Sequence, residues 1–500
     1  MEMQVRKIRR GGLGALCGVA IGLLSSMPGQ ATGAAPADSQ RARPNILFVF
    51  ADQLRYTALG SSGNEVVRTP NLDRLAGEGM AFDQAFSSHP LCSPYRAQIL
   101  TGRYGHCTGV IDNEYRLKPD QVTLAQVLGN AGYHTGFIGK WHLGYGPYTP
   151  DKRYGFDYMA AYDCGSGFYK TSYHENERGP IPFDKWAPEG ETDLAIRFVE
   201  EHTRTRADDP FALVMAWAPP HWPYDQYPKR FKVYDPAAVD LPRNVPVQMA
   251  AFARQELADY YGCISALDEQ MGRLLAALDR LGLADNTIVC FTSDHGDHLS
   301  SHGYGKPSDK WMHHSMRASK STPYDEAIHI PFLMRFPRRV QAKSRTKVMF
   351  SSVDVMPTLL GLCGLGVPEG VQGHDLSHVA FGKEGPPPPD SVYLQNMGPG
   401  WPYRGKWVGY WRGVRTERWV YARWHNNERE PMLFDRNNDP LEMQNLAGKA
   451  KFADVQQQME TRLQRWIADT NDPFDTGPRD PKTGMLELGQ EFADDKWNRP

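Results

Sequence analysis

The alternation of apolar strand-like runs with helical stretches is the feature that most constrains how this chain folds. Four strand-like segments, at residues 44–52, 134–144, 211–221 and 286–297, contain apolar runs, such as ILFVFA in the first and FALVMAWA in the third. A continuous apolar run indicates a strand that is buried on both faces, as in parallel sheets. The sequence therefore predicts an α/β fold with a large mixed, mostly parallel sheet flanked by helices.

Helical spacing is visible between these runs. Leu72, Leu75 and Met80 recur at helical intervals, and a later stretch forms a long amphipathic pattern that ends at a glycine. The predicted helical stretches are residues 69–86, 123–133 and 256–282.

The amino-acid composition changes after the predicted sheet. Residues 382–391 are rich in proline and glycine, which is typical of a linker. We expect an α/β domain over residues 43–381 and a smaller α+β subdomain with an antiparallel sheet over residues 392–500. The subdomain would close with a helix at roughly residues 451–470.

The N-terminus has the features of an export signal. A basic segment (VRKIRR) precedes a short apolar run (GLGALCGVAIGLL) and small residues (ATGAAPA). Residues 1–35 are therefore predicted to be a signal peptide, and the alternative is a short N-terminal anchor; Arg9 and Arg10 permit twin-arginine export. We expect a periplasmic or secreted mature protein without a membrane span.

Charge and cysteine content exclude little. The net charge of −2 neither favours nor excludes a polyanionic partner, and we expect no nucleic-acid partner. The 7 cysteines show no CxxC pair, so no zinc site is indicated, while one or two disulfides remain open. Cys290 lies in an apolar run and is interpreted as a core residue.

Two predicted strands end in acidic residues. Asp52 is followed by Gln53, and Asp294 is followed by His295. Ligands collect at the carboxyl ends of strands in open α/β sheets, and oxygen ligands suit a hard divalent cation. These four residues therefore predict a metal site for Ca²⁺, with Mg²⁺ also possible; the alternative is that each aspartate caps a turn.

A cysteine motif, CSPYRAQILTGR, lies between the two acids in sequence. Pro94 suits the first turn of a helix, which would place Cys92 at the helix N-terminus, where the dipole favours an anion. Arg96 shares the face of Cys92 because it lies one helical turn later. A thiolate phosphatase would place its arginine later, and a buried structural cysteine would not account for the arginine.

At these residues the chain resembles the type I, formylglycine-dependent sulfatases of the alkaline-phosphatase-like superfamily. CSPYRAQILTGR resembles the family signature Cys-x-Pro-x-Arg followed by Thr-Gly. RPNILFVFADQ, GKWHLG, PPHWP, TSDHG, KSTPYDEAIHIPFLMRFP and MLFDRNNDPLEMQNLAG resemble further family segments in the same order. The resemblance covers about residues 43–470.

The resemblance implies a modified nucleophile beside a metal. Cys92 would be converted to formylglycine (3-oxoalanine) by a formylglycine-generating maturation enzyme. One hydroxyl of the hydrated aldehyde would attack the sulfur of a sulfate ester, and the other would expel sulfate. Asp52, Gln53, Cys92, Asp294 and His295 would surround the metal, which is Ca²⁺ by resemblance.

The resemblance also implies five further catalytic residues. Arg96 and Lys140 would steady the hydrate and the charge on the transferred group. His142 would take the proton that drives sulfate release. His221 and Lys320 would bind sulfate and assist the leaving oxygen. Taken alone, a lysine before Trp-His is usually a solvated side chain, and a Pro-Pro-His-Trp-Pro loop is usually a rigid surface turn. For Lys140, His142, His221 and Lys320, it is the order of the motifs that favours the functional interpretation.

Three positions depart from the family pattern. Gln53 stands where many members have aspartate, and His295 stands where many have asparagine. Tyr95 occupies a position often held by serine in the maturation motif, although Cys92, Pro94 and Arg96 are intact. Conversion of the cysteine is still expected.

The substrate is indicated only by class. A cluster of basic residues after the strand that ends at Asp294 could bind an acidic sugar or belong to a solvated loop. Its members are His298, His302, Lys306, Lys310, His313, His314 and Arg317. Five tryptophans in the C-terminal region could stack on sugars, but the core interpretation is favoured. They are Trp401, Trp407, Trp411, Trp419 and Trp424.

The expected activity is hydrolysis of sulfate esters, on a sulfated small molecule or on sulfated carbohydrates during polysaccharide degradation. One alternative is a phosphodiester or phosphonate monoester hydrolase on the same scaffold. Another is a non-catalytic glycan-binding protein, which the intact set of candidate catalytic residues disfavours.

Overall fold

The computed structural model describes residues 43–113, 115–165, 167–304, 316–398, 402–403, 406–479 and 486–487. Of the two units into which the chain divides, the second, Ala42–Pro500, contains everything described below. The predicted signal peptide, residues 1–35, therefore lies outside the described residues.

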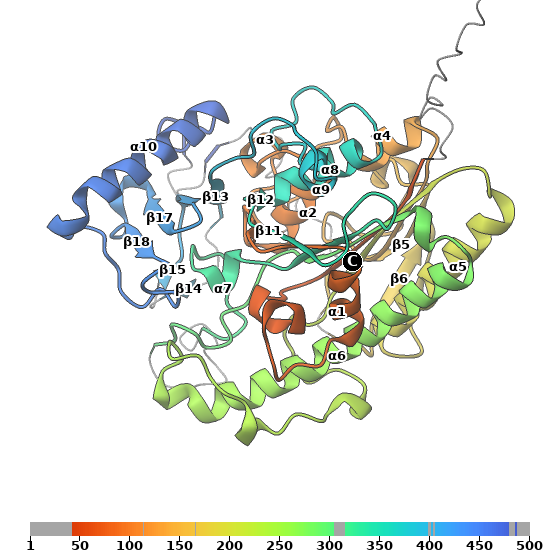
Figure 1. Ribbon diagram of the computed structural model, residues 1–500, viewed down its shortest axis with the longest axis horizontal. Coiled ribbons are helices and arrows are strands. Elements are labelled where there is room, and N and C mark those ends of the chain that lie inside the picture. Colours follow the sequence, from red (N-terminus) through yellow and green to blue (C-terminus); the bar gives the residue numbers. More distant parts are fainter. Residues whose placement is uncertain are drawn as a thin grey trace, which may run out of the picture. The chain divides into compact units, whose positions relative to one another are not determined.

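A ten-stranded sheet forms the centre of this second unit (Figure 1). Across the sheet the strands are β11 (Ser344–Thr346), β2 (Met80–Phe82), β10 (Phe332–Arg335), β9 (Thr287–Ser293), β1 (Asn45–Ala51), β8 (Phe211–Trp217), β4 (His134–Lys140), β5 (Tyr158–Tyr162), β6 (Ser172–Glu175) and β7 (Arg178–Pro182). The central strands from β9 to β5 are parallel, while β10, β6 and β7 are antiparallel to a neighbour. The predicted large mixed, mostly parallel sheet is confirmed.

Strand β1 shows why the strand sequences are apolar throughout. Leu47 and Val49 contribute to the core on one face of the sheet, whereas Phe48 and Phe50 contribute to the core on the other face. Successive strand side chains point to opposite faces, so a strand that is covered on both sides needs no polar alternation.

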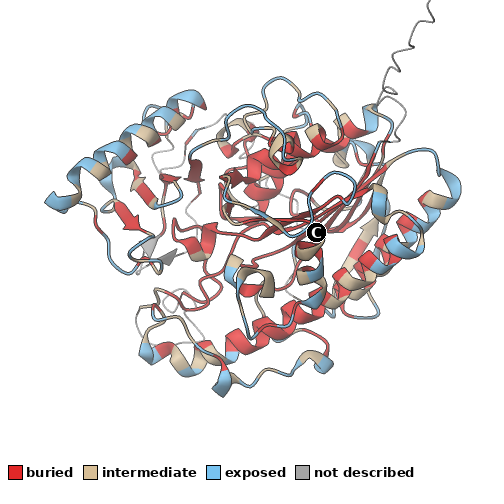
Figure 2. Cartoon of the chain, in the orientation of Figure 1, coloured by how far each residue is buried: buried red, intermediate tan, exposed pale blue. Residues whose placement is uncertain are grey.

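Helices cover both faces of the sheet (Figure 1). One face carries α1 (Pro70–Gly77), α5 (Ala187–Thr205) and α6 (Ala250–Arg280), and the other carries α2 (Cys92–Thr101), α4 (Leu124–Asn130) and α8 (Val355–Leu362). The short helices are α3 (Gly105–Thr108), α7 (Asp325–Ile328) and α9 (Ser377–Ala380). Figure 2 shows the strands buried and the outer helices exposed on one side, as amphipathic covering helices require.

One predicted helix is shorter than expected. The pattern of Leu72, Leu75 and Met80 predicted a helix over residues 69–86, but α1 ends at Gly77 and Met80 begins strand β2. Met80 pairs with Met334 of β10. Gly79 approaches the backbone of Met334 too closely for a side chain, so the glycine marks the change from helix to strand.

A smaller antiparallel sheet follows in the C-terminal region, as predicted. Its strands are β13 (Val392–Asn396), β16 (Trp411–Arg415), β17 (Trp419–Trp424) and β18 (Met432–Asp435), and α10 (Ala453–Asp469) packs against it. Two-stranded pairs join β12 (Phe350–Ser351) to β3 (Ala85–Phe86) and β14 (Pro402–Tyr403) to β15 (Lys406–Trp407).

Two tryptophans of the C-terminal region and Cys290 lie in the core. Trp411 and Trp424 are buried, which confirms the core interpretation for these two, whereas the side chains of Trp401 and Trp407 lie outside the described part. Cys290 is buried in the core, as predicted. All six cysteines of the described chain are free thiols. Within the described ranges, we find no helix with the length and apolar character that crossing a bilayer requires.

Candidate active site

The carboxyl ends of four parallel strands bring the predicted residues together. Asp52 follows β1, Asp294 follows β9, Lys140 ends β4, and His221 follows β8. These strands are neighbours in the sheet, so their ends meet at one edge. The carboxylates of Asp52 and Asp294 are completely buried there.

Cys92 is the first residue of α2 and lies among these groups. Leu91 before it is extended, and every residue of α2 is buried. The Cys92 Sγ lies 3.3 Å from His295 Nε2 and 3.6 Å from Asp52 Oδ1. It also lies 3.5 Å from Lys320 Nζ and 3.9 Å from Lys140 Nζ. If the cysteine is converted as the resemblance implies, this sulfur stands in for the oxygens of the hydrate.

Four side chains form a cluster that could hold a metal. One ligand atom each from Asp52, Cys92, Asp294 and His295 lies within 4.8 Å of all the others. Burial and the neighbouring Asp52 raise the pKa of Asp294 to about 7. A divalent cation would offset this repulsion between buried carboxylates, so the donor set fits a metal.

His295 is oriented for this role. Its Nδ1 lies 3.0 Å from the carbonyl oxygen of Gly296, which can only accept, so Nδ1 carries the proton. Nε2 then presents its lone pair to the cluster. Burial lowers the pKa of His295, so the ring is neutral at neutral pH, as a metal ligand must be.

Gln53 lies beside this cluster and is not one of its four members. Its backbone N–H donates to Asp294 Oδ1 at 2.9 Å. Its side-chain oxygen accepts from Lys320 Nζ at 2.9 Å, and its side-chain nitrogen donates to Asp297 Oδ2 at 2.8 Å. Asp297, which also accepts from Tyr224, was missed by the sequence analysis. Its position just after the TSDHG segment was the available signal.

Arg96 and Lys140 neutralise the two aspartates. Arg96 lies 3.1 Å from Asp52 Oδ2 and 3.3 Å from Asp294 Oδ2, and Lys140 lies 2.6 Å from Asp52 Oδ2. Burial alone would raise the pKa of Asp52, but Lys140 and the other nearby cations hold it well below its usual range. Burial alone would lower the pKa of Lys140, but Asp52 raises it. Both cations are therefore fixed charges.

His142 and His221 are both neutral at rest. Burial, together with the charge of Lys140 on His142 and of Lys320 on His221, lowers both pKa values well below the usual range. The His142 Nδ1 makes no hydrogen bond within the described chain. The His221 Nε2 lies 2.9 Å from Lys320 Nζ. Both rings can therefore accept a proton or a hydrogen bond.

Three of the basic residues after the second acidic strand lie in the described part of the chain, and each contacts other protein side chains. His298 is buried, with Nε2 2.7 Å from Thr322 Oγ1, and Arg317 is buried with Nε 2.8 Å from Glu256 Oε1. His302 stacks on Tyr324. Lys306, Lys310, His313 and His314 lie outside the described residues.

Comparison with known proteins agrees with this geometry. Residues 44–365 match the family described as Sulfatase, and residues 317–469 match N-sulphoglucosamine sulphohydrolase, C-terminal. The chain is 34% identical over 440 residues to an ulvan-active sulfatase of Formosa agariphila, covering 86% of this chain and 82% of the relative.

Two solved structures are similar in fold. A structure in complex with its substrate, D-glucosamine-2-N,6-O-disulfate, has 25% identity and a TM-score of 0.76, covering 87% of this chain and 100% of that one. A phosphonate monoester hydrolase of Agrobacterium radiobacter, at 22% identity and a TM-score of 0.67, covers 89% and 99% and shares the fold. The family match over most of the chain shows that this protein belongs to the sulfatase family and is a sulfatase.

Proposed function

We propose that this sulfatase hydrolyses sulfate esters of carbohydrates, with formylglycine formed from Cys92 as its nucleophile. The observation that carries the proposal is the surroundings of the Cys92 Sγ. Within 3.9 Å of this atom lie two potential metal ligands, Asp52 and His295, and two lysines, Lys140 and Lys320. A buried structural cysteine needs none of these neighbours.

The nucleophile and the metal would supply the bond-making chemistry. Hydrated formylglycine offers one hydroxyl to attack sulfur and a second whose deprotonation expels sulfate. Asp52, Asp294 and His295 would hold a divalent cation, Ca²⁺ as first choice and Mg²⁺ as second, which supplies Lewis-acid polarisation of a sulfate oxygen when bound. Gln53 would complete the set if its amide oxygen turned from Lys320 toward the cation.

The other residues would position charge and move protons. Arg96 and Lys140 are fixed cations in a buried site, so they would stabilise negative charge on the transferred group without reorganisation. His142 Nδ1 has no hydrogen-bond partner among the described residues, and the pKa of the ring is lowered, which would suit His142 to accept the proton in sulfate release. Lys320 donates to His221 at rest, and the pair would bind sulfate and assist the leaving oxygen.

Two similar proteins support the substrate class. One is described as an ulvan-active sulfatase, and the other is a solved structure in complex with its substrate, D-glucosamine-2-N,6-O-disulfate. We propose a sulfated saccharide as substrate, a maturation enzyme as partner, and a periplasmic or secreted location after removal of residues 1–35. We also propose residues 43–381 as the catalytic domain, 382–391 as a linker and 392–500 as the C-terminal subdomain.

The test is turnover by protein whose modification at Cys92 is confirmed by peptide mass spectrometry. Substrates are p-nitrophenyl sulfate, ulvan oligosaccharides, chondroitin 4-sulfate disaccharide and N-acetylglucosamine 6-sulfate. The expected result is sulfate release from at least one saccharide and none by Cys92→Ala. Full activity with an unmodified thiol would refute the formylglycine mechanism. Faster turnover of p-nitrophenyl phenylphosphonate than of every sulfate ester would favour the phosphonate monoester alternative.

A further inference from the structure

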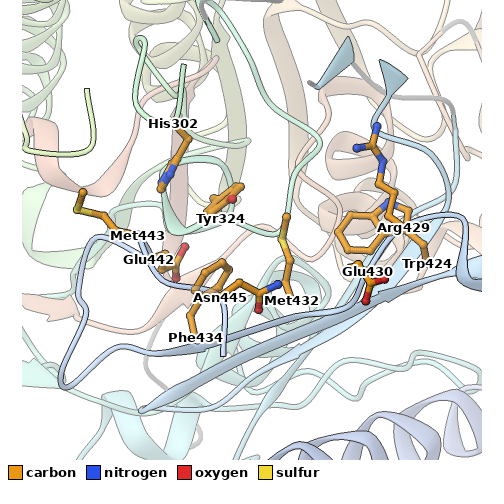
Figure 3. Close-up of a pocket in the computed structure, with 10 residues that line it drawn as sticks. All are labelled: His302, Tyr324, Trp424, Arg429, Glu430, Met432, Phe434, Glu442, Met443 and Asn445. Carbon is orange, nitrogen blue, oxygen red and sulfur yellow. The ribbon is translucent and has the colours of Figure 1, made fainter. Parts of the chain in front are cut away.

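A cavity lined largely by residues of the C-terminal region carries none of the residues of the sulfate centre. Its volume is about 310 Å³, within the range of small-molecule sites. Its base is formed by Tyr324, Met432 and Phe434, which are mostly buried in the core of the small sheet. Figure 3 shows Tyr324 between His302 and Phe434, with Arg429 and Glu430 toward one end and Met443 at the other.

The base of the cavity is rigid and aromatic. The rings of Tyr324 and His302 stack with centroids 4.0 Å apart, and the ring centroids of Tyr324 and Phe434 are 5.5 Å apart. The rim is exposed and partly polar, because it includes Glu430 and Asn445 beside Met443. An apolar base with a polar rim is the usual lining of a site for a molecule with one apolar face and several hydroxyl groups.

A buried carboxyl group in the cavity has unused hydrogen-bonding capacity. Glu442 is 2% exposed and lines the cavity. Its Oε2 accepts from the Asp325 N–H at 2.9 Å. Its Oε1 has no hydrogen-bond partner among the described residues and lies 3.7 Å from Arg436 Nη1. Burial and the nearby Asp325 raise the pKa of Glu442, which favours the neutral acid. A neutral acid can both donate to and accept from a hydroxyl group.

The charges of the cavity differ from those of the sulfate centre. Arg429 is accompanied by Glu430, so no cationic excess is available for a sulfate group. Tyr324 lies four residues after Lys320, so their Cα atoms are at most about 14 Å apart. The cavity is therefore near enough to receive another unit of a chain whose sulfated unit is bound at Lys320.

We propose that this cavity binds an unsulfated sugar ring of an oligosaccharide substrate. This inference rests on the proposed function, because it extends the substrate from a single sulfated sugar to an oligosaccharide. Its base would contact the apolar face of the ring, and Glu442 with the rim residues would bind ring hydroxyls.

The experiment fills the cavity from its exposed rim. Met443 is 58% exposed, so Met443→Trp can be introduced with little cost to folding, and Val122→Trp, at a position 49% exposed ahead of α4, is the matched control. Binding of unsulfated cellotriose, xylotriose and laminaritriose to the matured enzyme is measured by saturation-transfer NMR and titration. Hydrolysis of p-nitrophenyl sulfate is measured in parallel.

We expect the wild type and Val122→Trp to bind at least one neutral trisaccharide, with Met443→Trp at least tenfold weaker. All three should hydrolyse p-nitrophenyl sulfate within twofold of one another. Absence of trisaccharide binding by the wild type, or equal binding by Met443→Trp, would overturn the proposal. If Met443→Trp fails to fold, the double variant Arg429→Ala, Glu430→Ala takes its place, and its trisaccharide binding is compared with that of the wild type and of Val122→Trp. Absence of sulfate release by the matured wild type from p-nitrophenyl sulfate and from every sulfated saccharide would instead refute the proposed function.

Discussion

Trp411 ties the C-terminal sheet to the active site through one hydrogen bond, and its loss should slow catalysis. The completely buried indole donates from Nε1 to the Ser321 carbonyl oxygen at 2.9 Å. Ser321 has a left-handed φ of 65°, and its N–H donates to Pro90 O at 3.0 Å. Residues in such a conformation persist when surrounding contacts hold them. Lys320, whose Nζ lies 3.5 Å from the Cys92 Sγ, immediately precedes Ser321.

Trp411→Phe keeps an aromatic ring but leaves the buried Ser321 carbonyl without its donor. An unpaired buried acceptor costs about 1–3 kcal/mol. If about half of the upper value appears as transition-state stabilisation that a displaced Lys320 no longer provides, the rate falls about tenfold, since each 1.4 kcal/mol is a factor of ten. We therefore expect kcat/KM for p-nitrophenyl sulfate to fall about tenfold per molecule of formylglycine-containing enzyme.

Trp424→Phe is the matched control. Trp424 pairs with Trp411 across β16 and β17, is also buried, and donates from Nε1 to Val408 O at 2.6 Å. Both variants should lose similar thermal stability, measured by calorimetry, but Trp424→Phe should keep kcat/KM within twofold. The reasoning fails if Trp411→Phe retains wild-type kcat/KM, or if Trp424→Phe loses as much activity.

Three further predictions concern the nucleophile, the metal and stability. Cys92→Ser should release at most one equivalent of p-nitrophenol and retain sulfate, detectable by intact mass; sustained turnover would contradict the two-hydroxyl mechanism. Asp294→Ala and exhaustive chelation should each lower activity about a hundredfold or more, and the melting transition should remain in both cases. A sample that elemental analysis shows to be free of metal and that is still active would contradict this. Burial would lower the pKa of His106, but Asp472 raises it to about 9. The stability that the wild type has over His106→Gln, at most about 3 kcal/mol, should therefore be full below about pH 6.5 and should disappear as the pH rises through about 9. A pH-independent difference in urea unfolding would refute the ion pair.

The strand ends of this site could be predicted because they obey a general rule. Asp52 and Asp294 follow long apolar runs, and the carboxyl ends of parallel strands meet. Cys92 and Arg96 could be placed on one helix face because Pro94 marks the first turn. In these cases local sequence alone determines the geometry.

Other features depend on contacts between distant segments. His142 and Ser321 have left-handed φ values of 53° and 65°, which no local pattern of non-glycine residues indicates. Asp297 matters because it accepts from Gln53, a residue far away in sequence. Met80 was assigned to a helix because its spacing fits, whereas its pairing with β10 decides the structure. Tertiary contacts override local preference at these positions.

The balance of buried charge leads to a final prediction about inorganic sulfate. Arg96, Lys140 and Lys320 surround Asp52 and Asp294, and a bound divalent cation would add further positive charge. A buried cationic excess is costly, so an anion that occupies the centre should stabilise the folded state. At a hundred times its Kd, sulfate should add about 2.7 kcal/mol to the free energy of unfolding. Millimolar sulfate should therefore raise the melting temperature of the wild type, while chloride at equal ionic strength should not. Lys140→Met removes one cation from the centre and should abolish most of the shift, and an equal shift in this variant would show that sulfate acts elsewhere on the protein.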